Sequence, residues 1–189
     1  MFESLVRKNR SYRRFYENER VSRETLLKLI DYARLSPSGT NRQALRYYVS
    51  CDKALNAEIS TGLRWAAYLK DWGGPEAGER PSAYIVMVQD EQYKAVTTID
   101  YGIASQSILL GAVELGLGGC IIGNLDRAII REALGIPESQ EILLVIALGK
   151  PKEVVVIEEI GPEGDIKYWR DEQQVHHVPK RKLEDIVLN

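Results

Sequence analysis

A long, mainly apolar segment, residues 107–125, places the strongest limit on how this chain can fold. It is near the length of a membrane-spanning helix, but Glu114, Asn124 and several glycines interrupt it. Such a pattern indicates a buried helix that turns into a buried strand, not a transmembrane helix. We therefore predict a long helix over about residues 96–117, followed directly by a strand at 118–123.

The predicted long helix carries two kinds of side chain. Small residues between Gly102 and Ala112 would let another helix approach it closely. Larger residues recur at helical spacing along one side of this helix. These residues are Ile99, Ile103, Gln106, Leu110, Val113 and Leu117.

The rest of the chain alternates between helix and strand patterns. Ser22 and Asp126 are typical helix N-caps, and Gly135 is a typical helix stop. Beyond Pro151 the periodicity weakens into a charged, aromatic tail for which we predict no regular element. The predicted helices cover about residues 22–36, 55–72 and 127–134, and the predicted strands cover 45–51, 83–88 and 142–148.

Composition points to one ordinary globular domain over residues 1–189. Apolar residues make up 44% of the chain and charged residues 28%, with a net charge of -2, so neither a nucleic-acid partner nor a membrane surface is implied. The N-terminus has no signal-peptide pattern, because Arg7 and Lys8 follow a short mixed segment. We expect a cytoplasmic protein in which Cys51 and Cys120 are buried thiols and not a disulfide.

Several familiar sites are missing from the sequence. It contains no Gly-x-Gly-x-x-Gly fingerprint and no Walker A sequence. The only histidines, His176 and His177, are adjacent, so their side chains point apart on an extended segment and have no partner at metal-ligand spacing. We therefore predict no metal site and no catalytic side chain, and expect that any reaction depends on a bound cofactor.

Two polar stretches flank the helix predicted over residues 22–36. In the first, Arg10, Ser11 and Arg13 place fixed positive charge and a hydroxyl together, which suits a phosphate dianion. Taken alone, this stretch is more typical of a solvated basic turn, and only its combination with the second stretch favours a phosphate site.

The second polar stretch combines a tight turn with two carboxamides. Pro37, Ser38 and Gly39 alone would only stop a helix. Asn41 and Gln43 follow with a spacing that puts both on one side of the chain. Carboxamides both donate and accept hydrogen bonds, so they can match the alternating edge of a flavin pyrimidine ring.

Taken together, the order Arg-Ser-x-Arg, helix, Pro-Ser-x-x-Asn-x-Gln resembles the nitroreductase family of FMN-dependent oxidoreductases, with a similarity that extends from Arg7 to about Ile186. The resemblance implies an α+β fold with a mixed, mostly antiparallel central sheet surrounded by helices. It also implies an intertwined homodimer with two flavins at the interface. Each flavin would then contact Arg10, Ser11 and Arg13 of one chain and Pro37, Ser38 and Asn41 of the other. Asn9 departs from the family pattern, in which many relatives carry a further arginine, and this leaves the number of phosphate cations open.

The resemblance implies two more groups of FMN ligands. At Ile122 and Gly123, a turn would bring backbone N–H groups to the reactive N5 side of the flavin, because glycine permits close approach. Near the C-terminus, the run Lys180, Arg181 and Lys182 resembles a basic patch that reaches the phosphate. Which of these three cations would do so stays open, and a solvated tail is an equal alternative.

The activity implied by the resemblance is transfer of a hydride from NADH or NADPH through N5 of FMN to a small-molecule acceptor such as a nitroaromatic, quinone or enone. No protein acid or base is required for it. Trp65, Tyr68 and Trp72 are candidates for a lid over the acceptor, although core packing would explain them equally well. The alternatives are a non-catalytic flavin-binding dimer and a specialised flavin enzyme of the same fold that performs reductive dehalogenation or flavin fragmentation.

Overall fold

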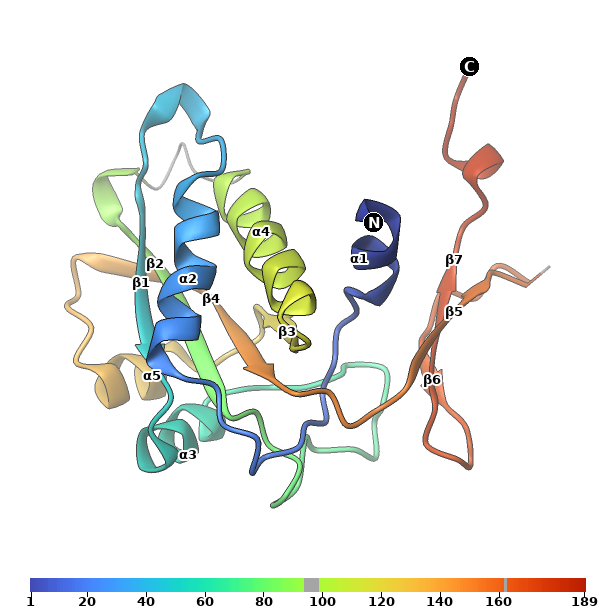
Figure 1. Cartoon of the computed structure of the whole chain (residues 1–189), viewed down its shortest axis with the longest axis horizontal. Coiled ribbons are helices and arrows are strands. Elements are labelled where there is room, and N and C mark those ends of the chain that lie inside the picture. The colour runs from blue at the N-terminus through green and yellow to red at the C-terminus, as the bar shows by residue number, and fades with distance from the viewer. Residues whose placement is uncertain (94–98, 162) are drawn as a thin grey trace.

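The central element of the fold is a four-stranded sheet with the strand order β1-β2-β4-β3, shown in Figure 1. The computed structural model describes residues 1–93, 99–161 and 163–189. All three strand pairings in this sheet are antiparallel, so the expected parallel component is not found here. The strands are β1 (Leu45–Ser50), β2 (Ala83–Asp90), β3 (Gly118–Ile122) and β4 (Gln140–Gly149).

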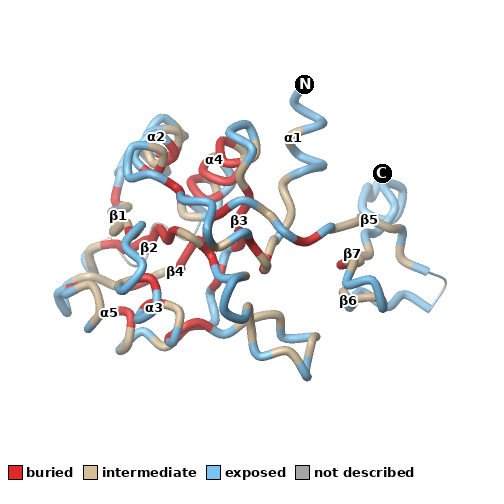
Figure 2. The backbone as a smooth tube through the Cα atoms, turned by 60° about the horizontal axis from the view of Figure 1, so that its bottom comes forward, coloured by how far each residue is buried: buried red, intermediate tan, exposed pale blue. Residues whose placement is uncertain are grey.

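Helices cover both faces of the sheet, which confirms the α+β architecture (Figure 2). On one face α2 (Arg23–Arg34) and α4 (Asp100–Glu114) pack over residues such as Ile85 of β2. On the other face α3 (Lys53–Thr61) and α5 (Arg127–Leu134) pack over residues such as Val86. Successive strand residues point to opposite faces, and helices cover both faces. Both sets of β2 side chains are therefore buried, and residues 83–88 are all apolar.

Capping residues set the start of α2 and both ends of α5, as predicted. The Ser22 hydroxyl accepts a hydrogen bond from the backbone N–H of Thr25 at 3.1 Å, and Asp126 caps α5 in the same way. Gly135 ends α5 in the left-handed conformation, with φ of 61°. The predicted boundaries of α5 are therefore confirmed.

Two helix predictions need correction. The helix expected to continue from residue 55 to about 72 ends at Thr61, because Leu63 pairs with Leu125 and the Arg64 N–H donates to the Asn124 carbonyl at 3.0 Å. The start expected for the long helix, near residue 96, falls outside the described residues, and α4 begins at Asp100.

The side of α4 that packs in the core is not the side on which the larger residues recur. The buried residues include Ala104, Ile108 and Ala112, whereas Ile99 is 72% exposed. The small residues do allow a close helix contact, but within the same chain: a Cβ at Gly111 would lie 2.4 Å from the Tyr32 ring of α2.

The C-terminal tail, for which no element was predicted, forms a second, three-stranded sheet with the order β5-β7-β6. In it β5 and β7 are parallel, and β6 and β7 are antiparallel. Figure 1 shows this sheet apart from the central one, with α1 (Phe2–Lys8) between them. Its strands are β5 (Val155–Glu159), β6 (Trp169–Arg170) and β7 (His176–Lys180), and 3-10 helices cover Gly39–Asn41, Glu91–Tyr93 and Leu183–Asp185.

Both cysteines are free thiols, as expected, but only Cys120 is buried. Burial raises the pKa of the Cys120 thiol. Cys51 is exposed, because β1 ends at Ser50 and the chain turns there toward α3. None of the described helices has both the length and the hydropathy needed to cross a membrane.

Candidate cofactor site

The first polar stretch lines a basic cavity of about 360 Å³. Its walls include Arg10, Ser11 and Arg13, with Lys180 at the end of β7 and His176 at its start. The described residues that line this cavity include three permanent cations and no carboxylate. A lining of this charge attracts an anion.

Backbone contacts with β3 place the N-terminal segment. Ser11 forms an isolated parallel bridge with Gly119, and the N–H of Tyr12 donates to the Gly119 carbonyl at 3.0 Å. Arg10 donates from Nη2 to the Val6 carbonyl at 3.0 Å, but its buried Nε has no hydrogen-bond partner among the described residues. Burial lowers the pKa of Arg10. Arg10 therefore lines the cavity and keeps one donor that no described residue uses.

Arg13 has a more enclosed position than Arg10 and is 9% exposed. Its Nη1 donates to the Ser11 carbonyl at 3.1 Å and lies 3.2 Å from His176 Nε2, and the guanidinium lies over the Tyr168 ring at 4.7 Å from its centre. The backbone N–H of Arg13 donates to the buried Glu153 carboxylate. Arg13 therefore lines the cavity and also joins the N-terminal segment to the C-terminal sheet.

His176 was not predicted to be near the site. It is fully buried, and burial, with help from Arg13 and Arg170, lowers the pKa of its imidazole to about 4. It is therefore neutral at physiological pH and adds no charge to the cavity. Tyr168 was missed as well. No local pattern could have placed either residue, because their contacts with Arg13 join the N-terminal segment to the C-terminal sheet.

The predicted turn after β3 lies next to the basic cavity. Ile122 and Gly123 line a neighbouring cavity of about 170 Å³, which shares Arg13 and Ile121 with the basic one. A Cβ at Gly123 would contact nothing within 4 Å, so the backbone is open to approach there. The structure thus brings together three of the predicted motifs: the N-terminal cations, the turn after β3 and the C-terminal patch.

Within that patch, Lys180 lines the basic cavity, whereas Arg181 and Lys182 do not. Both of these are exposed, and Lys182 Nζ lies 4.0 Å from a Glu159 carboxylate oxygen. Of the three candidate cations, the geometry favours Lys180.

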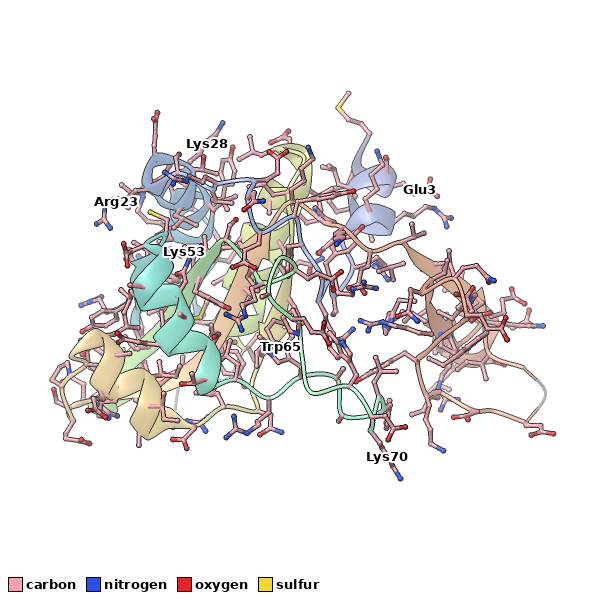
Figure 3. All side chains as sticks on the ribbon, turned by 90° about the horizontal axis from the view of Figure 1, so that it is seen from below. Glu3, Arg23, Lys28, Lys53, Trp65 and Lys70 are labelled. Carbon is pink, nitrogen blue, oxygen red and sulfur yellow. The ribbon has the colours of Figure 1, made fainter. Side chains whose placement is uncertain are left out.

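The aromatic lid candidates have different surroundings. Trp65 lines the cavity at Gly123, in the segment that Figure 3 shows between α3 and the C-terminal sheet. Tyr68 packs on Tyr168 with ring centres 5.0 Å apart, and the Arg170 guanidinium lies 4.3 Å from the centre of the Trp72 ring. Only Trp65 among them borders the predicted flavin turn.

The second polar stretch lines a different cavity, of about 240 Å³, through Pro37, Ser38 and Gln43. Asp100, at the start of α4, organises the turn: it accepts hydrogen bonds from the Ser38 hydroxyl at 2.7 Å and from the Gly39 N–H at 3.0 Å. The Gln43 N–H in turn donates to the Ser38 oxygen at 3.0 Å. Asp100 was not among the predicted site residues.

The carboxamides lie on a strained, exposed segment. Thr40, Asn41 and Gln43 have φ values of 49°, 54° and 49°, in the left-handed region that residues other than glycine rarely adopt. Asn41 is exposed and does not line the cavity at Pro37. That cavity and the basic cavity share no lining residue. A single chain therefore keeps the two predicted halves of the flavin site apart.

The fold and these cavities define an α+β protein with a basic cavity beside the edge strand of an antiparallel sheet, and no carboxylate is among the described residues that line this cavity. The model of the nitroreductase family matches residues 6–150. The chain belongs to the nitroreductase family.

Individual relatives agree with this assignment. The chain is 30% identical, over an alignment of 148 positions, to a protein of Archaeoglobus fulgidus that is assigned as an NADH dehydrogenase/NAD(P)H nitroreductase. The match covers 74% of this chain and 80% of that protein. Among solved structures, a nitroreductase family protein of Clostridium novyi NT matches with a TM-score of 0.68 at 23% identity, covering 100% of this chain and 99% of the other. An FMN-dependent nitroreductase of Clostridium difficile matches with a TM-score of 0.67 at 24% identity, covering 98% and 96%.

Proposed function

We propose that the protein is an FMN-dependent oxidoreductase that uses NADH or NADPH to reduce a small-molecule acceptor such as a nitroaromatic, quinone or enone. The observation that carries this proposal is the basic cavity, which is lined by Arg10, Arg13 and Lys180 and adjoins the cavity at the Gly123 turn through the shared residues Arg13 and Ile121. The names of the relatives, which include an NADPH-flavin oxidoreductase of Vibrio harveyi, support it.

The residues of the basic cavity fit the phosphate of FMN. Arg10, Arg13 and Lys180 supply charge-assisted donors and Ser11 supplies a hydroxyl, which is the donor set that a phosphate dianion prefers. The adjoining cavity at Ile122 and Gly123 offers an open backbone for the isoalloxazine ring.

The separation of the two half-sites supports a homodimer in which each flavin lies between two chains. In that arrangement the Pro37 to Asn41 turn of one chain would complete the basic cavity of the other. Two features favour coverage by a partner: the exposed side chain of Ile99, just before α4, and an open apolar groove formed by Phe2, Leu5 and Leu110 with their neighbours.

Bound FMN would supply the hydride chemistry, accepting from the nicotinamide and passing the electrons to the acceptor. The residues of the chain would hold and orient it. The cations neutralise the phosphate, and the lack of a Cβ at Gly123 lets the backbone approach the ring. Trp65 would shape the space above that turn and limit the access of water.

Absorbance spectroscopy tests this proposal directly. We expect the purified protein to be yellow and to release about one FMN per chain on denaturation, and the spectrum to bleach with NADH or NADPH under anaerobic conditions. A colourless protein that does not take up added FMN would refute the cofactor. A yellow protein that neither nicotinamide reduces would instead be the non-catalytic flavin-binding alternative.

A further inference from the structure

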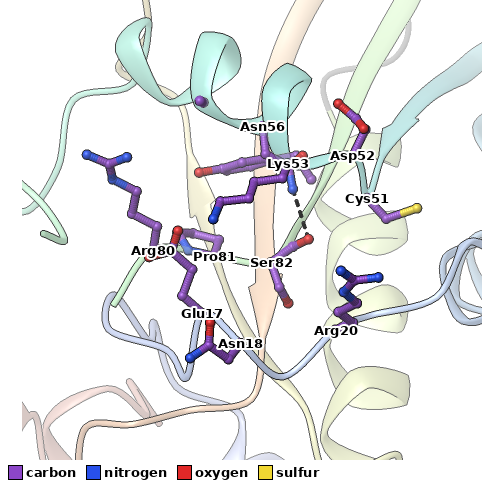
Figure 4. Close-up of a pocket in the computed structure, with 12 residues that line it drawn as sticks. Glu17, Asn18, Arg20, Cys51, Asp52, Lys53, Asn56, Arg80, Pro81 and Ser82 are labelled. Atoms are coloured by element: carbon purple, nitrogen blue, oxygen red, sulfur yellow. Dashed lines mark hydrogen bonds between the residues drawn. The ribbon is translucent and has the colours of Figure 1, made fainter. Parts of the chain in front are cut away.

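A separate polar cavity, of about 410 Å³, lies between the segment before α2, the start of α3 and the start of β2 (Figure 4). It shares no lining residue with the basic cavity or with the cavities at Gly123 and Pro37. A volume of this size falls within the range typical of small-molecule sites. The proposed redox function gives this cavity no role.

Three residues that line this cavity each carry a buried polar atom with no hydrogen-bond partner among the described residues: Tyr84 Oη, Ser82 Oγ and Asn56 Oδ1. Tyr84 is 1% exposed and Asn56 is 9% exposed. The other amide atom of Asn56 is satisfied, because Nδ2 donates to the Ser82 carbonyl at 2.9 Å, the bond drawn in Figure 4. A buried polar group without a partner costs free energy, so three of them around one cavity indicate a ligand that supplies the missing bonds.

The charges on the walls limit what that ligand can be. Arg20, Lys53 and Arg80 line the cavity and make no ion pair with any described residue. Figure 4 shows Lys53 extended over the cavity, with Arg80 on one side and Arg20 on the other. Two carboxylates line the same cavity: Asp52 caps α3 through the Leu55 N–H at 2.9 Å, and Glu17 accepts from the Gly78 N–H.

Three cations and two carboxylates leave an excess of one positive charge, which suits a monoanion or a zwitterion better than a phosphate dianion. The cations would hold an anionic group, and the hydroxyls of Tyr84 and Ser82 can donate to it. Asn56 Oδ1 and the carboxylates require a donor on the same ligand.

From this arrangement we propose that the cavity is a second ligand site, which binds a small carboxylic acid with an amino or hydroxyl group on the α carbon. The carboxylate pairs with Lys53, which extends over the cavity, and the α substituent donates to Asn56 Oδ1, while Arg20 and Arg80 add positive charge on either side. The site is independent of FMN, so it can bind its ligand whether or not the proposed redox function holds.

The test uses the full chain as purified and the probes L-serine, L-glutamine and L-lactate, with acetate and inorganic phosphate as comparison anions. Binding is followed by amide chemical shifts in two-dimensional NMR. We expect at least one probe to give saturable shifts in residues 51–57 and 80–84, with an affinity about tenfold or more above that of acetate or phosphate. The proposal is overturned if no probe gives saturable shifts there, or if acetate or phosphate binds as tightly as the best probe.

Two substitutions examine the geometry. Lys53→Met should weaken the binding of the best probe by about tenfold, and Tyr84→Phe should weaken it severalfold. Tyr84→Phe keeps the buried ring and removes only an unpartnered hydroxyl, so the variant should fold, which a thermal melt verifies. Lys28→Met, on the outer surface of α2 (Figure 3), is the matched charge control and should bind like the parent. Parent-like binding by both Lys53→Met and Tyr84→Phe would overturn the site.

Discussion

Arg10 and Arg13 are three positions apart in the sequence but have different surroundings. The Arg10 side chain is held by one hydrogen bond to a carbonyl and keeps an unused donor, whereas Arg13 is enclosed by Ser11, His176 and Tyr168. Replacing Arg13 would therefore disturb the contact with the C-terminal sheet as well as any ligand. Arg10 is the better residue for testing phosphate binding.

Arg10→Ala should weaken FMN binding by about 1.5 to 3 kcal/mol, the range for loss of a hydrogen bond to a charged group, and should leave the melting temperature of the apo-protein nearly unchanged. Fluorescence titration of the apo-protein with FMN measures the affinity. Arg7→Ala removes an exposed cation that pairs with Glu3 on α1 and is the control, with parent-like affinity expected. Equal affinity for both variants would place Arg10 outside the site.

A second residue-scale prediction concerns Glu79, which ties the loop before β2 to the N-terminal segment. The Arg14 guanidinium binds its carboxylate in a bidentate manner, with Nη2 to Oε1 at 2.6 Å, and Lys152 Nζ lies 2.9 Å from the same oxygen. Hydrogen bonding to Arg14, the largest cause, lowers the pKa of Glu79 from 4.5 to about 2.

Because the pKa of Glu79 is lower in the folded state, its contribution to stability is present above about pH 5 and is lost as the pH falls toward 2. At neutral pH it amounts to roughly 3 kcal/mol of unfolding free energy. Glu79→Gln should lower the free energy of unfolding at pH 7. In urea unfolding, the free energy of unfolding of this variant should fall less steeply than that of the parent between pH 5 and pH 3. Glu172→Gln, at an exposed position, should keep the steep profile of the parent. A steep profile in Glu79→Gln would assign the acid sensitivity to other carboxylates.

At the scale of elements, the sequence predicts best what short-range contacts decide. The ends of α5 follow from Asp126 and Gly135 alone, so they could be predicted. The end of α3 could not, because the apolar spacing continues through Leu63, and only its pairing with Leu125 removes that residue from the helix. The small C-terminal sheet depends on parallel pairing between β5 and β7, which joins segments distant in sequence and leaves little periodicity to detect.

In the candidate site, too, the sequence predicts what residue type and order decide and misses what long-range contacts decide. Arg10, Ser11, Arg13 and Lys180 could be proposed from residue type and order, and the fold brings them to one cavity. Asp100 could not be proposed, because its role depends on the contact of the start of α4 with the Ser38 turn. From the sequence alone, an aspartate at the start of a helix would be interpreted as a residue that stabilises the helix N-terminus.

Replacing each of two glycines of α4 by alanine should change the stability of the protein in opposite directions. Gly111→Ala would place a Cβ 2.4 Å from the Tyr32 ring, so we expect a loss of about 1 to 3 kcal/mol from overpacking between α2 and α4. Gly102→Ala meets nothing within 4 Å and should be neutral or stabilise the helix by up to about 1 kcal/mol. Urea unfolding of both variants measures the difference. Similar stabilities would show that Tyr32 moves aside without cost.

At the scale of the whole molecule, the main question is how the two halves of the proposed flavin site meet. One half lies at the basic cavity, near Gln106 and Leu109 of α4, and the other lies at the start of the same helix, near Asp100. If a partner chain supplies the second half, FMN binding and dimer formation are thermodynamically linked. Dilution should then release flavin, and the apo-protein should melt earlier and with a stronger dependence on concentration than the holo-protein.

Subunit mixing gives the sharpest test of a shared site. Arg10→Ala changes the basic half of the proposed site and Asn41→Leu the carboxamide half, and each variant alone should be inactive at a limiting FMN concentration. If each flavin lies between chains, a mixed dimer collects both changes in one site and leaves the other site intact. We therefore expect recovery of about one working site per mixed dimer, measured as bound FMN and as anaerobic oxidation of NADH or NADPH. If subunit exchange is demonstrated, for example by native mass spectrometry, and no site recovers, each site is built within a single chain. In that case the turn at Pro37 must move to the basic cavity of its own chain when FMN binds.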